Sequence, residues 1–389
     1  MQLSTACQPV FASHQSHLFG QIPPNPALLI SVIIPARNEA SNLERSLHAL
    51  RNQQQAEGLA FPTGVYEVLL LLNNCTDESE VVARSYQQRY PNFPLRIASI
   101  QLPAKMANVG TVRRLLMNEA YQRLIEVNKP NGIIASTDAD TVVDQQWLYH
   151  ILQETDSGCE AVGGRILTRP DGNPVRLNYL RDVTYRMLVA QSEAQIDPQP
   201  YDPWPRHFQH FGASLALTCA AYKRVGGLPD VPHLEDEALY RALLRTDTRI
   251  RQSPNVRVTT STRMQGQATI GFSEQLRYWA TMNRAKKCQL AEPAGAVIRR
   301  LRNRSRLRLS WQKRFNNPQE VNSLTLTATE LMIDADWLRN ELVTNRYFGQ
   351  LWENVEAKMA TGQWGAAWPL VPITDAIDEL RVFLRTILH

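Results

Sequence analysis

The chain has 389 residues, of which 43% are hydrophobic and 20% are charged. This balance excludes an intrinsically disordered protein. A norm of about 150 residues per domain predicts roughly two or three domains, or one large fold with an extension. No run approaches the roughly 18 apolar residues of a membrane-spanning helix, and the first residues lack the pattern of a secretory signal peptide. The formal net charge of +5 favours anionic partners such as nucleotides, nucleic acid or acidic lipid surfaces.

The five cysteines are scattered along the chain, and no two of them form a CxxC pair. An odd number of unclustered cysteines fits neither a disulfide framework nor a zinc site. The sequence therefore predicts a reducing compartment, the cytoplasm, for this chain.

Residues 1–27 carry a proline-rich run and are predicted to be an irregular lead-in. In residues 28–141, short apolar runs alternate with segments of helical spacing. Strands are predicted at 28–35, 66–72, 95–101 and 132–137, and helices at 39–54, 77–90 and 109–127. The helix over 77–90 is expected to bury Val81 and Val82. This alternation predicts βαβ units and an α/β fold with a mostly parallel sheet flanked by helices.

In residues 142–270 the predicted elements are mixed, and after residue 270 the chain is predicted to be helical. Strands are expected at 160–168 and 256–260, and helices at 176–194, 220–225, 237–244, 324–342, 346–359 and 375–388. Residues 197–205 are rich in proline and predict a loop, of the kind that often forms lids or binding segments. We therefore expect a helical C-terminal extension over residues 271–389.

Polar side chains follow three of the predicted strands, at residues 35–39, 73–77 and 138–141. The carboxyl ends of parallel strands meet at one edge of a sheet, and ligands bind there in open α/β sheets. These three segments are therefore the first place to look for a binding site.

Asp138 and Asp140 are the sharpest feature of this edge. Their hard carboxylate oxygens suit Mg²⁺ or Mn²⁺, which would bridge a diphosphate. An Asx turn followed by a helix cap would explain the same triplet. Together with the neighbouring segments, the pair favours the metal.

Glu235 and Asp236 precede a predicted helix, where the helix dipole stabilises carboxylate anions. A carboxylate there can take a proton from an attacking hydroxyl if it faces the site. Taken alone, the pair is better explained by a plain acidic first turn. His233 could be a metal ligand or a base, but a lone histidine more often makes a structural hydrogen bond.

Small residues and arginines supply further candidates. Residues 212–217 are small enough to let backbone approach a bound sugar, or else to pack a helix tightly on a sheet. Arg113, Arg114 and Arg263 can each contact a phosphate, although a solvated helix face is the simpler explanation for the first two.

The segments SVIIPARNE (31–39), NNCTD (73–77), TDADT (137–141) and the Glu235–Asp236 pair resemble the nucleotide-sugar-dependent family 2 glycosyltransferases. The resemblance covers about residues 28–265. It implies a GT-A fold at residues 28–270, with a nucleotide-binding half at 28–141 and an acceptor half at 142–270. It also implies inverting sugar transfer with a divalent metal, Mn²⁺ or Mg²⁺, on the DXD motif.

Carried over residue by residue, the resemblance makes Asp236 the catalytic base and gives the metal to Asp140 and Asp138. Asn73 or Asn74 stands where the family often has an aspartate that contacts the base, and an amide can also contact a base edge. The donor-binding residues that the resemblance implies are Pro35, Ala36, Arg37, Glu39, Asn73, Asn74, Arg113, Asp138, Glu235 and Arg263.

Several other functions are less well supported. The family's QxxRW signature is absent, and residues 275–279 (QLRYW) are only loosely similar to it. Processive polysaccharide synthesis is therefore not expected. A nucleotidyltransferase would need a glycine-rich loop after the first strand, and a dinucleotide-dependent oxidoreductase would need GxGxxG there. Residues 35–39 (PARNE) contain no glycine, which counts against both classes. A non-catalytic sugar-nucleotide-binding protein would be favoured only by loss of the carboxylates. The acceptor hydroxyl can belong to a small molecule, a glycan or a lipid-linked carrier.

Residues 299–314 carry eight lysines and arginines. This basic stretch can make a peripheral contact with an acidic membrane, which would place the chain at the inner face of the membrane near a lipid-linked acceptor. A solvated helix face, partly paired with acidic neighbours, explains it equally. Aromatic residues are few there, so no nucleic acid is expected.

Overall fold

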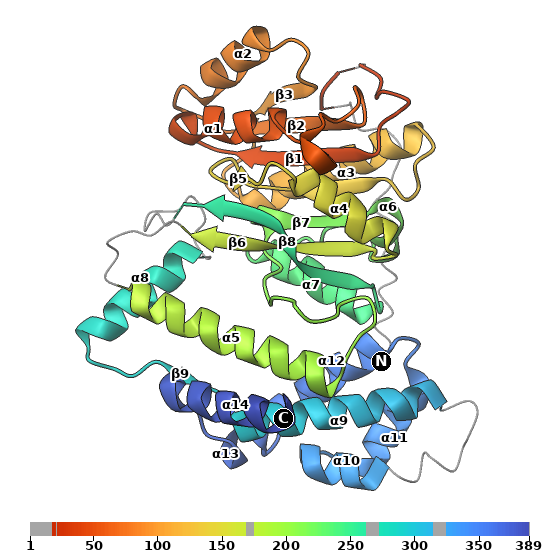
Figure 1. Ribbon diagram of the computed structural model, residues 1–389, viewed down its shortest axis with the longest axis vertical. Coiled ribbons are helices and arrows are strands. Elements are labelled where there is room, and N and C mark those ends of the chain that lie inside the picture. The colour runs from red at the N-terminus through yellow and green to blue at the C-terminus, as the bar shows by residue number, and fades with distance from the viewer. Residues whose placement is uncertain (1–17, 21, 169–174, 262–271, 314–323, 389) are drawn as a thin grey trace.

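The computed structural model describes residues 18–20, 22–168, 175–261, 272–313 and 324–388 (Figure 1). An α/β layer lies at one end of the molecule and a layer of helices lies at the other. No helix within the described ranges is both long and apolar enough to cross a membrane.

Eight strands of the described ranges form one sheet, in the order β3-β2-β1-β4-β7-β6-β8-β5. β7 and β5 run antiparallel to their neighbours, and the other strands share one direction. The predicted α/β fold with a mostly parallel sheet is therefore confirmed. The strands are β1 (Ile30–Ala36), β2 (Tyr66–Asn73), β3 (Leu95–Ile100), β4 (Ile133–Ser136), β5 (Val142–Val143), β6 (Ala161–Thr168), β7 (Leu215–Thr218) and β8 (Ile250–Thr260).

Helices cover both faces of this sheet. Successive residues of a strand point to opposite sides, so an apolar strand contributes side chains to a core on each face. Ile30, Val32 and Ile34 of β1 pack in the core that includes α1, α2 and α4. Ile33 packs in the core on the other face, with α3, α6 and α7. The helices are α1 (Ala40–Arg51), α2 (Ser79–Arg89), α3 (Val109–Glu126), α4 (Trp147–Asp156), α6 (Cys219–Arg224) and α7 (Glu235–Arg245), with short 3₁₀ helices η1 (Ala56–Gly58) and η2 (Gly212–Ser214).

Of the two valines expected to face inward from α2, Val82 packs against the core, but the expectation for Val81 is wrong. Val81 is 64% exposed, because α2 buries Ser79, Ala83 and Tyr86, which lie on one face at helical spacing. The small residues of 212–217 lie in and next to the sheet, where Gly212 packs against Arg113 of α3. They form η2 and most of β7, a strand that inserts between β4 and β6.

The remaining helices form the second layer, which confirms a helical C-terminal extension. Its core includes Leu307, Leu331, Leu342 and Leu351. A short antiparallel pair, β9 with β10, interrupts the helices. The elements are α8 (Phe272–Arg284), β9 (Leu290–Ala291), α9 (Ala294–Lys313), α10 (Leu324–Leu331), α11 (Ala335–Thr344), α12 (Phe348–Ala360), α13 (Trp364–Ala367), β10 (Val371–Pro372) and α14 (Ile373–Leu388).

The single helix predicted over 324–342 is two helices. Met332 has a positive φ of 58°, a backbone conformation that interrupts a right-handed helix. The side chain of Asp334 then accepts a hydrogen bond from the backbone N–H of Trp337, which caps the start of α11.

A long helix joins the two layers. α5 (Arg176–Ile196) follows β6 along the chain, yet it lies beside α9 and α14 (Figure 1). Tyr185 and Leu188 of α5 pack against Ile373 and Ile377 of α14, and Val189 packs near Val297 of α9. The loop at residues 197–211, which runs from α5 to η2, therefore leads from the helical layer back to the sheet.

Candidate functional site

The loops after β1 and β2 are tied to each other by short hydrogen bonds. The side chain of Asn38 accepts from the backbone N–H of Thr76 at 2.8 Å. The Asp77 carboxylate accepts from the backbone N–H groups of Ala40 at 3.1 Å and Ser79 at 3.0 Å. Asp77 thus satisfies donors at the starts of both α1 and α2, which fixes the two loops side by side.

The predicted donor-binding residues after β1 lie along this joined rim. Pro35 and Ala36 are buried as the last two residues of the strand. Arg37 is exposed, and its Nη1 donates to the carbonyl of Ala107 at 3.0 Å. Glu39 is buried, and its carboxylate accepts from the Asn42 side chain at 2.9 Å.

The structure separates the two asparagines that end β2. The Asn74 amide exchanges two hydrogen bonds of 2.9 Å with the backbone of Leu102. Asn74 therefore holds the segment that follows β3 in place. Asn73 is 3% exposed, and its Oδ1 atom has no hydrogen-bond partner within the described ranges. A buried acceptor without a partner costs about 1–3 kcal/mol, which a bound ligand could recover.

The Asp138–Thr141 turn after β4 is fixed to the end of β8. The Asp140 carboxylate accepts from the Ser261 hydroxyl at 2.6 Å, and the hydroxyls of Thr141 and Thr260 lie 3.1 Å apart. The backbone N–H of Thr141 donates to the carbonyl of Asp138 at 3.1 Å, which closes the turn.

A buried arginine on α3 brings the distant acidic motifs together. Arg113 has a side chain that is 5% exposed, and its Nη2 donates to Asp138 Oδ1 at 2.6 Å. Its Nη1 donates to a carboxylate oxygen of Glu235. Gly212 lies against the same guanidinium, since a Cβ atom there would come within 2.5 Å of Arg113 Cζ. Sequence analysis expected Arg113 to contact phosphate, and here it faces two carboxylates.

Asp236 lies beside this cluster, held by two backbone donors. Its Oδ2 accepts from the N–H of Gly212 at 2.8 Å, and its Oδ1 accepts from the N–H of Glu237 at 2.9 Å. The structure therefore brings Asp138, Glu235 and Asp236 to one place, although they come from separate parts of the chain.

This place carries more negative than positive charge. The pKa of Asp138 is raised to about 6: desolvation of the carboxylate is the main cause, Arg113 lowers the pKa, and the charges of Asp140, Asp236 and Glu235 raise it. Bringing in a cation would relieve that repulsion. The carboxylate oxygens are of the kind that Mg²⁺ and Mn²⁺ prefer, and such ions are often held by one or two carboxylates together with substrate phosphates. Among the described residues, no three His, Cys, Asp or Glu side chains are grouped as a metal site.

Other predicted residues lie elsewhere or cannot be placed. Arg114 forms an ion pair of 2.7 Å with the exposed carboxylate of Asp230, apart from the Arg113 cluster. His233 is exposed. Arg263 lies outside the described residues, so its predicted phosphate contact stays a prediction.

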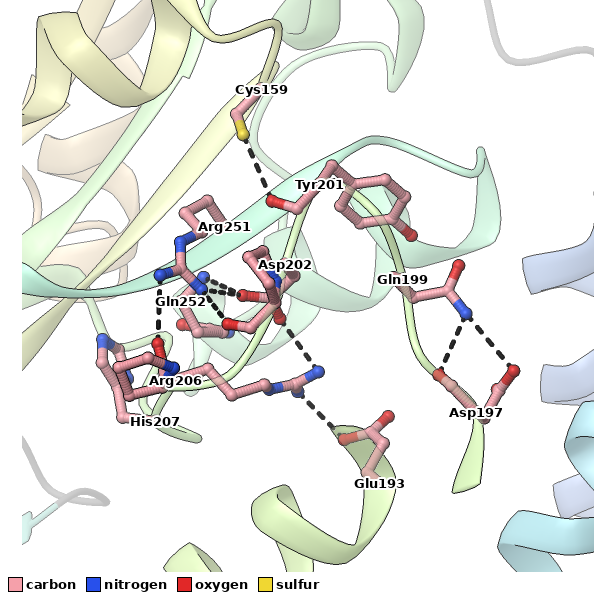
Figure 2. A network of polar contacts seen from close by, with 12 residues as sticks. Cys159, Glu193, Asp197, Gln199, Tyr201, Asp202, Arg206, His207, Arg251 and Gln252 are labelled. Atoms are coloured by element: carbon pink, nitrogen blue, oxygen red, sulfur yellow. Dashed lines mark hydrogen bonds and ion pairs between the residues drawn. The ribbon is translucent and has the colours of Figure 1, made fainter. Parts of the chain in front are cut away.

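The ion pairs that hold the 197–211 loop were not predicted from the sequence. Figure 2 shows Asp202 between two arginines, with Arg251 at 3.0 Å and Arg206 at 2.9 Å. Arg206 also binds Glu193 on α5 at 2.9 Å. No short motif signals this network, because its members are spread over residues 193–251 and meet only in the folded chain.

Much of the basic stretch at 299–314 is also used inside the protein. Arg304 binds Asp197 at 2.7 Å and Glu193, while Arg308 binds Asp197 at 3.0 Å. Arg300 and Arg306 pair with Glu292 and Glu330, each at 2.9 Å. These contacts favour the explanation of a helix face paired with acidic neighbours. Arg314 lies outside the described residues.

Comparisons with known proteins agree with the motifs. Residues 31–216 match the family model described as Glycosyl transferase family 2. Glycosyltransferase AglE of Haloferax volcanii is 29% identical over 171 residues, which are 43% of this chain and 49% of AglE. The chain thus spans about half the length of the curated relative it matches.

Two solved structures align over most of the chain. Mannosyltransferase PcManGT from Pyrobaculum calidifontis, in complex with GDP-Man and Mn²⁺, is 17% identical, with a TM-score of 0.42 over 93% of this chain and 89% of its own. S. aureus TarS 1–349 is 15% identical, with a TM-score of 0.42 over 87% of this chain and 91% of its own. The match to this family model over residues 31–216 confirms the resemblance drawn from the motifs.

Proposed function

We propose that this protein transfers a sugar from a nucleotide-diphosphate donor to an acceptor hydroxyl, with inversion at the anomeric carbon. One observation carries the proposal. Asp138, Glu235 and Asp236 converge on the buried Arg113 at the carboxyl end of β4, within and next to a family 2 domain. Ligands of open α/β sheets bind at this edge.

Asp236 is the proposed general base. The N–H groups of Gly212 and Glu237 orient its two oxygens, and each carboxylate oxygen still has a lone pair to accept a proton. Asp236 takes the proton of the acceptor hydroxyl while that oxygen attacks the anomeric carbon. The bond to the diphosphate breaks on the opposite face of the sugar, through an oxocarbenium-like transition state.

Asp138 and Asp140 are the proposed metal ligands. When bound, Mg²⁺ or Mn²⁺ would offset the negative charge that develops on the leaving diphosphate. The excess negative charge around Asp138 supports this assignment. Glu235 contributes indirectly, since its ion pair with Arg113 holds that guanidinium beside Asp138.

Asn73 is the proposed contact to the nucleotide base. Its Oδ1 is the buried acceptor that has no hydrogen-bond partner among the described residues, whereas both ends of the Asn74 amide are hydrogen-bonded to the backbone of Leu102. Pro35, Ala36, Arg37 and Glu39 then border the nucleoside along the rim that follows β1.

The first experiment screens UDP, GDP and their sugars by thermal shift and calorimetry, with and without Mn²⁺. Incubation with the binding donor and a panel of acceptors follows, and the products are separated. Released nucleoside diphosphate with a glycosylated acceptor supports transfer. Pyrophosphate release would indicate a nucleotidyltransferase, and binding without turnover would indicate a non-catalytic sugar-nucleotide-binding protein.

Two variants test the assigned roles. Asp236→Asn should lower kcat by at least about 100-fold, with the donor Kd within about twofold of wild type. Asp140→Ala should abolish the Mn²⁺ dependence of nucleotide binding. The control is Asp230→Asn, since that carboxylate is 76% exposed and pairs with Arg114 away from the cluster. Full turnover by Asp236→Asn would show that the base is another residue.

A peripheral contact with acidic lipid is proposed for one edge of α9 only. Arg299 and Arg302 are exposed along this edge and lie three residues apart in the helix. Sedimentation with vesicles of phosphatidylglycerol and phosphatidylcholine should lose bound protein on Arg299→Glu/Arg302→Glu substitution. Equal sedimentation with phosphatidylcholine alone would refute an electrostatic contact.

A further inference from the structure

Two histidines of the 197–211 loop, His207 and His210, have opposite surroundings. His207 is 2% exposed, and its Nε2 faces the carbonyls of Gly163 at 3.2 Å and Ser253 at 3.1 Å. Its Nδ1 accepts from the N–H of Gln209 at 3.0 Å. Burial lowers the pKa of His207 to about 3, so the ring is neutral. Its contacts with the carbonyls of Gly163 and Ser253 attach the loop to β6 and β8.

His210 instead faces an acceptor at each ring nitrogen. Nδ1 lies 3.2 Å from the carbonyl of Phe208, and Nε2 lies 2.5 Å from Glu237 Oε2. Its ring also stacks on Tyr240, with centroids 3.9 Å apart and planes 4° apart. Each ring nitrogen of His210 therefore lies within hydrogen-bond distance of an oxygen that can accept a hydrogen bond.

The partner of His210 lies next to the proposed base. Glu237 follows Asp236 in the first turn of α7, and its other carboxylate oxygen binds Arg241 at 2.7 Å. The hydrogen bond from His210 is the main cause that lowers the pKa of Glu237 to about 2, so Glu237 stays ionised. A charge-assisted hydrogen bond of this kind is among the stronger contacts of a protein.

The loop also leads directly from His210 to the base. Gly212 lies two residues after His210, and its N–H donates to Asp236 Oδ2 at 2.8 Å. His210 and Gly212 therefore fasten one short segment to two consecutive residues of α7, Glu237 and Asp236. Loss of the first contact would free the segment to move away from the second.

We propose that His210 is a positioning residue, which binds Glu237 and so holds the Gly212 N–H against the carboxylate of Asp236. This inference rests on the proposed function, in which Asp236 is the base. The Gly212 N–H stabilises the carboxylate form and fixes its orientation toward the acceptor hydroxyl. A misplacement of a catalytic group by about 1 Å can cost about 100-fold in rate.

The test compares three variants in the full chain. His210→Phe keeps the ring that stacks on Tyr240 but removes both hydrogen bonds. His210→Gln keeps a donor that can reach Glu237. Arg241→Met is the matched control, because it removes the other partner of Glu237 and leaves His210 in place. Circular dichroism and thermal unfolding verify that each variant is folded.

The first readout is hydrogen exchange of the Gly212 amide by mass spectrometry, which needs no substrate. We expect exchange to rise at least about tenfold in His210→Phe, partly in His210→Gln, and less than twofold in Arg241→Met. The second readout is turnover of the donor identified in the screen. We expect kcat to fall about 10- to 100-fold in His210→Phe, with the donor KM within twofold of wild type.

Unchanged Gly212 exchange in folded His210→Phe overturns the inference. So does wild-type kcat in that variant while Asp236→Asn is inactive. Full turnover by Asp236→Asn refutes the proposed base instead, whatever His210→Phe does. Should His210→Phe fail to fold, Glu237→Met takes its place, because methionine removes the oxygen that binds His210, and the same exchange and the same overturning result are expected.

Discussion

The two rims of the candidate site are built from different interactions. At the ends of β1 and β2, the loops are joined by side chains that cap nearby backbone N–H groups, as Asp77 does for Ala40 and Ser79. Along the 197–211 loop, the chain is held by ion pairs between side chains, such as those of Asp202 with Arg206 and Arg251.

This difference predicts how each rim responds to substitution. A capping hydrogen bond is worth about 1 kcal/mol, and its loss leaves groups that water can reach. Removing one partner of a buried ion pair leaves a buried charge and costs about 3–5 kcal/mol. Arg113 is buried between Asp138, Glu235 and Gly212, so it should be the most sensitive position of the site.

The largest effect is expected for Arg113→Met. This change leaves Asp138 and Glu235 without their shared cation and should lower the free energy of unfolding by about 3–5 kcal/mol. Arg114→Met is the neighbouring control, and it should cost at most about 1 kcal/mol because its partner Asp230 is exposed. Urea unfolding measures both. Similar losses in the two variants would contradict the role given to Arg113.

Arg304→Met should have the next largest effect. Its guanidinium binds Glu193 and the 3%-exposed carboxylate of Asp197, so its loss should cost about 2–3 kcal/mol. Arg306→Met on the same helix should cost less than about 1 kcal/mol, since that side chain is 46% exposed. Equal unfolding midpoints for the two variants in urea would show that the ion pairs of the 197–211 loop are not stronger than exposed ones.

Acid should weaken the ion pairs that hold the 197–211 loop, and so lower the free energy of unfolding. Burial by itself raises the pKa of Glu193, but the charges of Arg304 and Arg206 more than offset it and lower the pKa to about 2. The ordinary value is 4.5, so this stabilisation is complete above that pH and is lost as the pH falls from there toward 2. The urea midpoint should therefore fall less steeply over this range in Arg304→Met than in wild type. A parallel fall in both proteins would contradict the assignment.

The smallest effect on stability is expected for the loops at the ends of β1 and β2. Asn74→Ala removes both hydrogen bonds to Leu102 at a residue with a φ of 49°, and should cost about 1–2 kcal/mol. Asn73→Ala should leave stability nearly unchanged and weaken nucleotide binding. Thermal unfolding and calorimetry with UDP and GDP separate the two outcomes, and a reversal of them would exchange the roles of the asparagines.

Elements with local signals could be predicted directly from the order of their residues. Apolar runs gave the buried strands β1, β2 and β4, and the polar residues after them were correctly expected at one edge. The family followed from short motifs at these strand ends. These signals could be read because strand alternation, helical spacing and capping act over a few neighbouring residues.

Tertiary structure alone decided which charged groups meet. Arg113 pairs with Asp138, 25 residues away, and with Glu235, 122 residues away, so no spacing rule connects them. The same holds for His210 and Glu237, 27 residues apart, and for the insertion of β7 between β4 and β6. An ion pair depends only on where the fold brings two side chains, and the energy of burying them depends on everything packed around them.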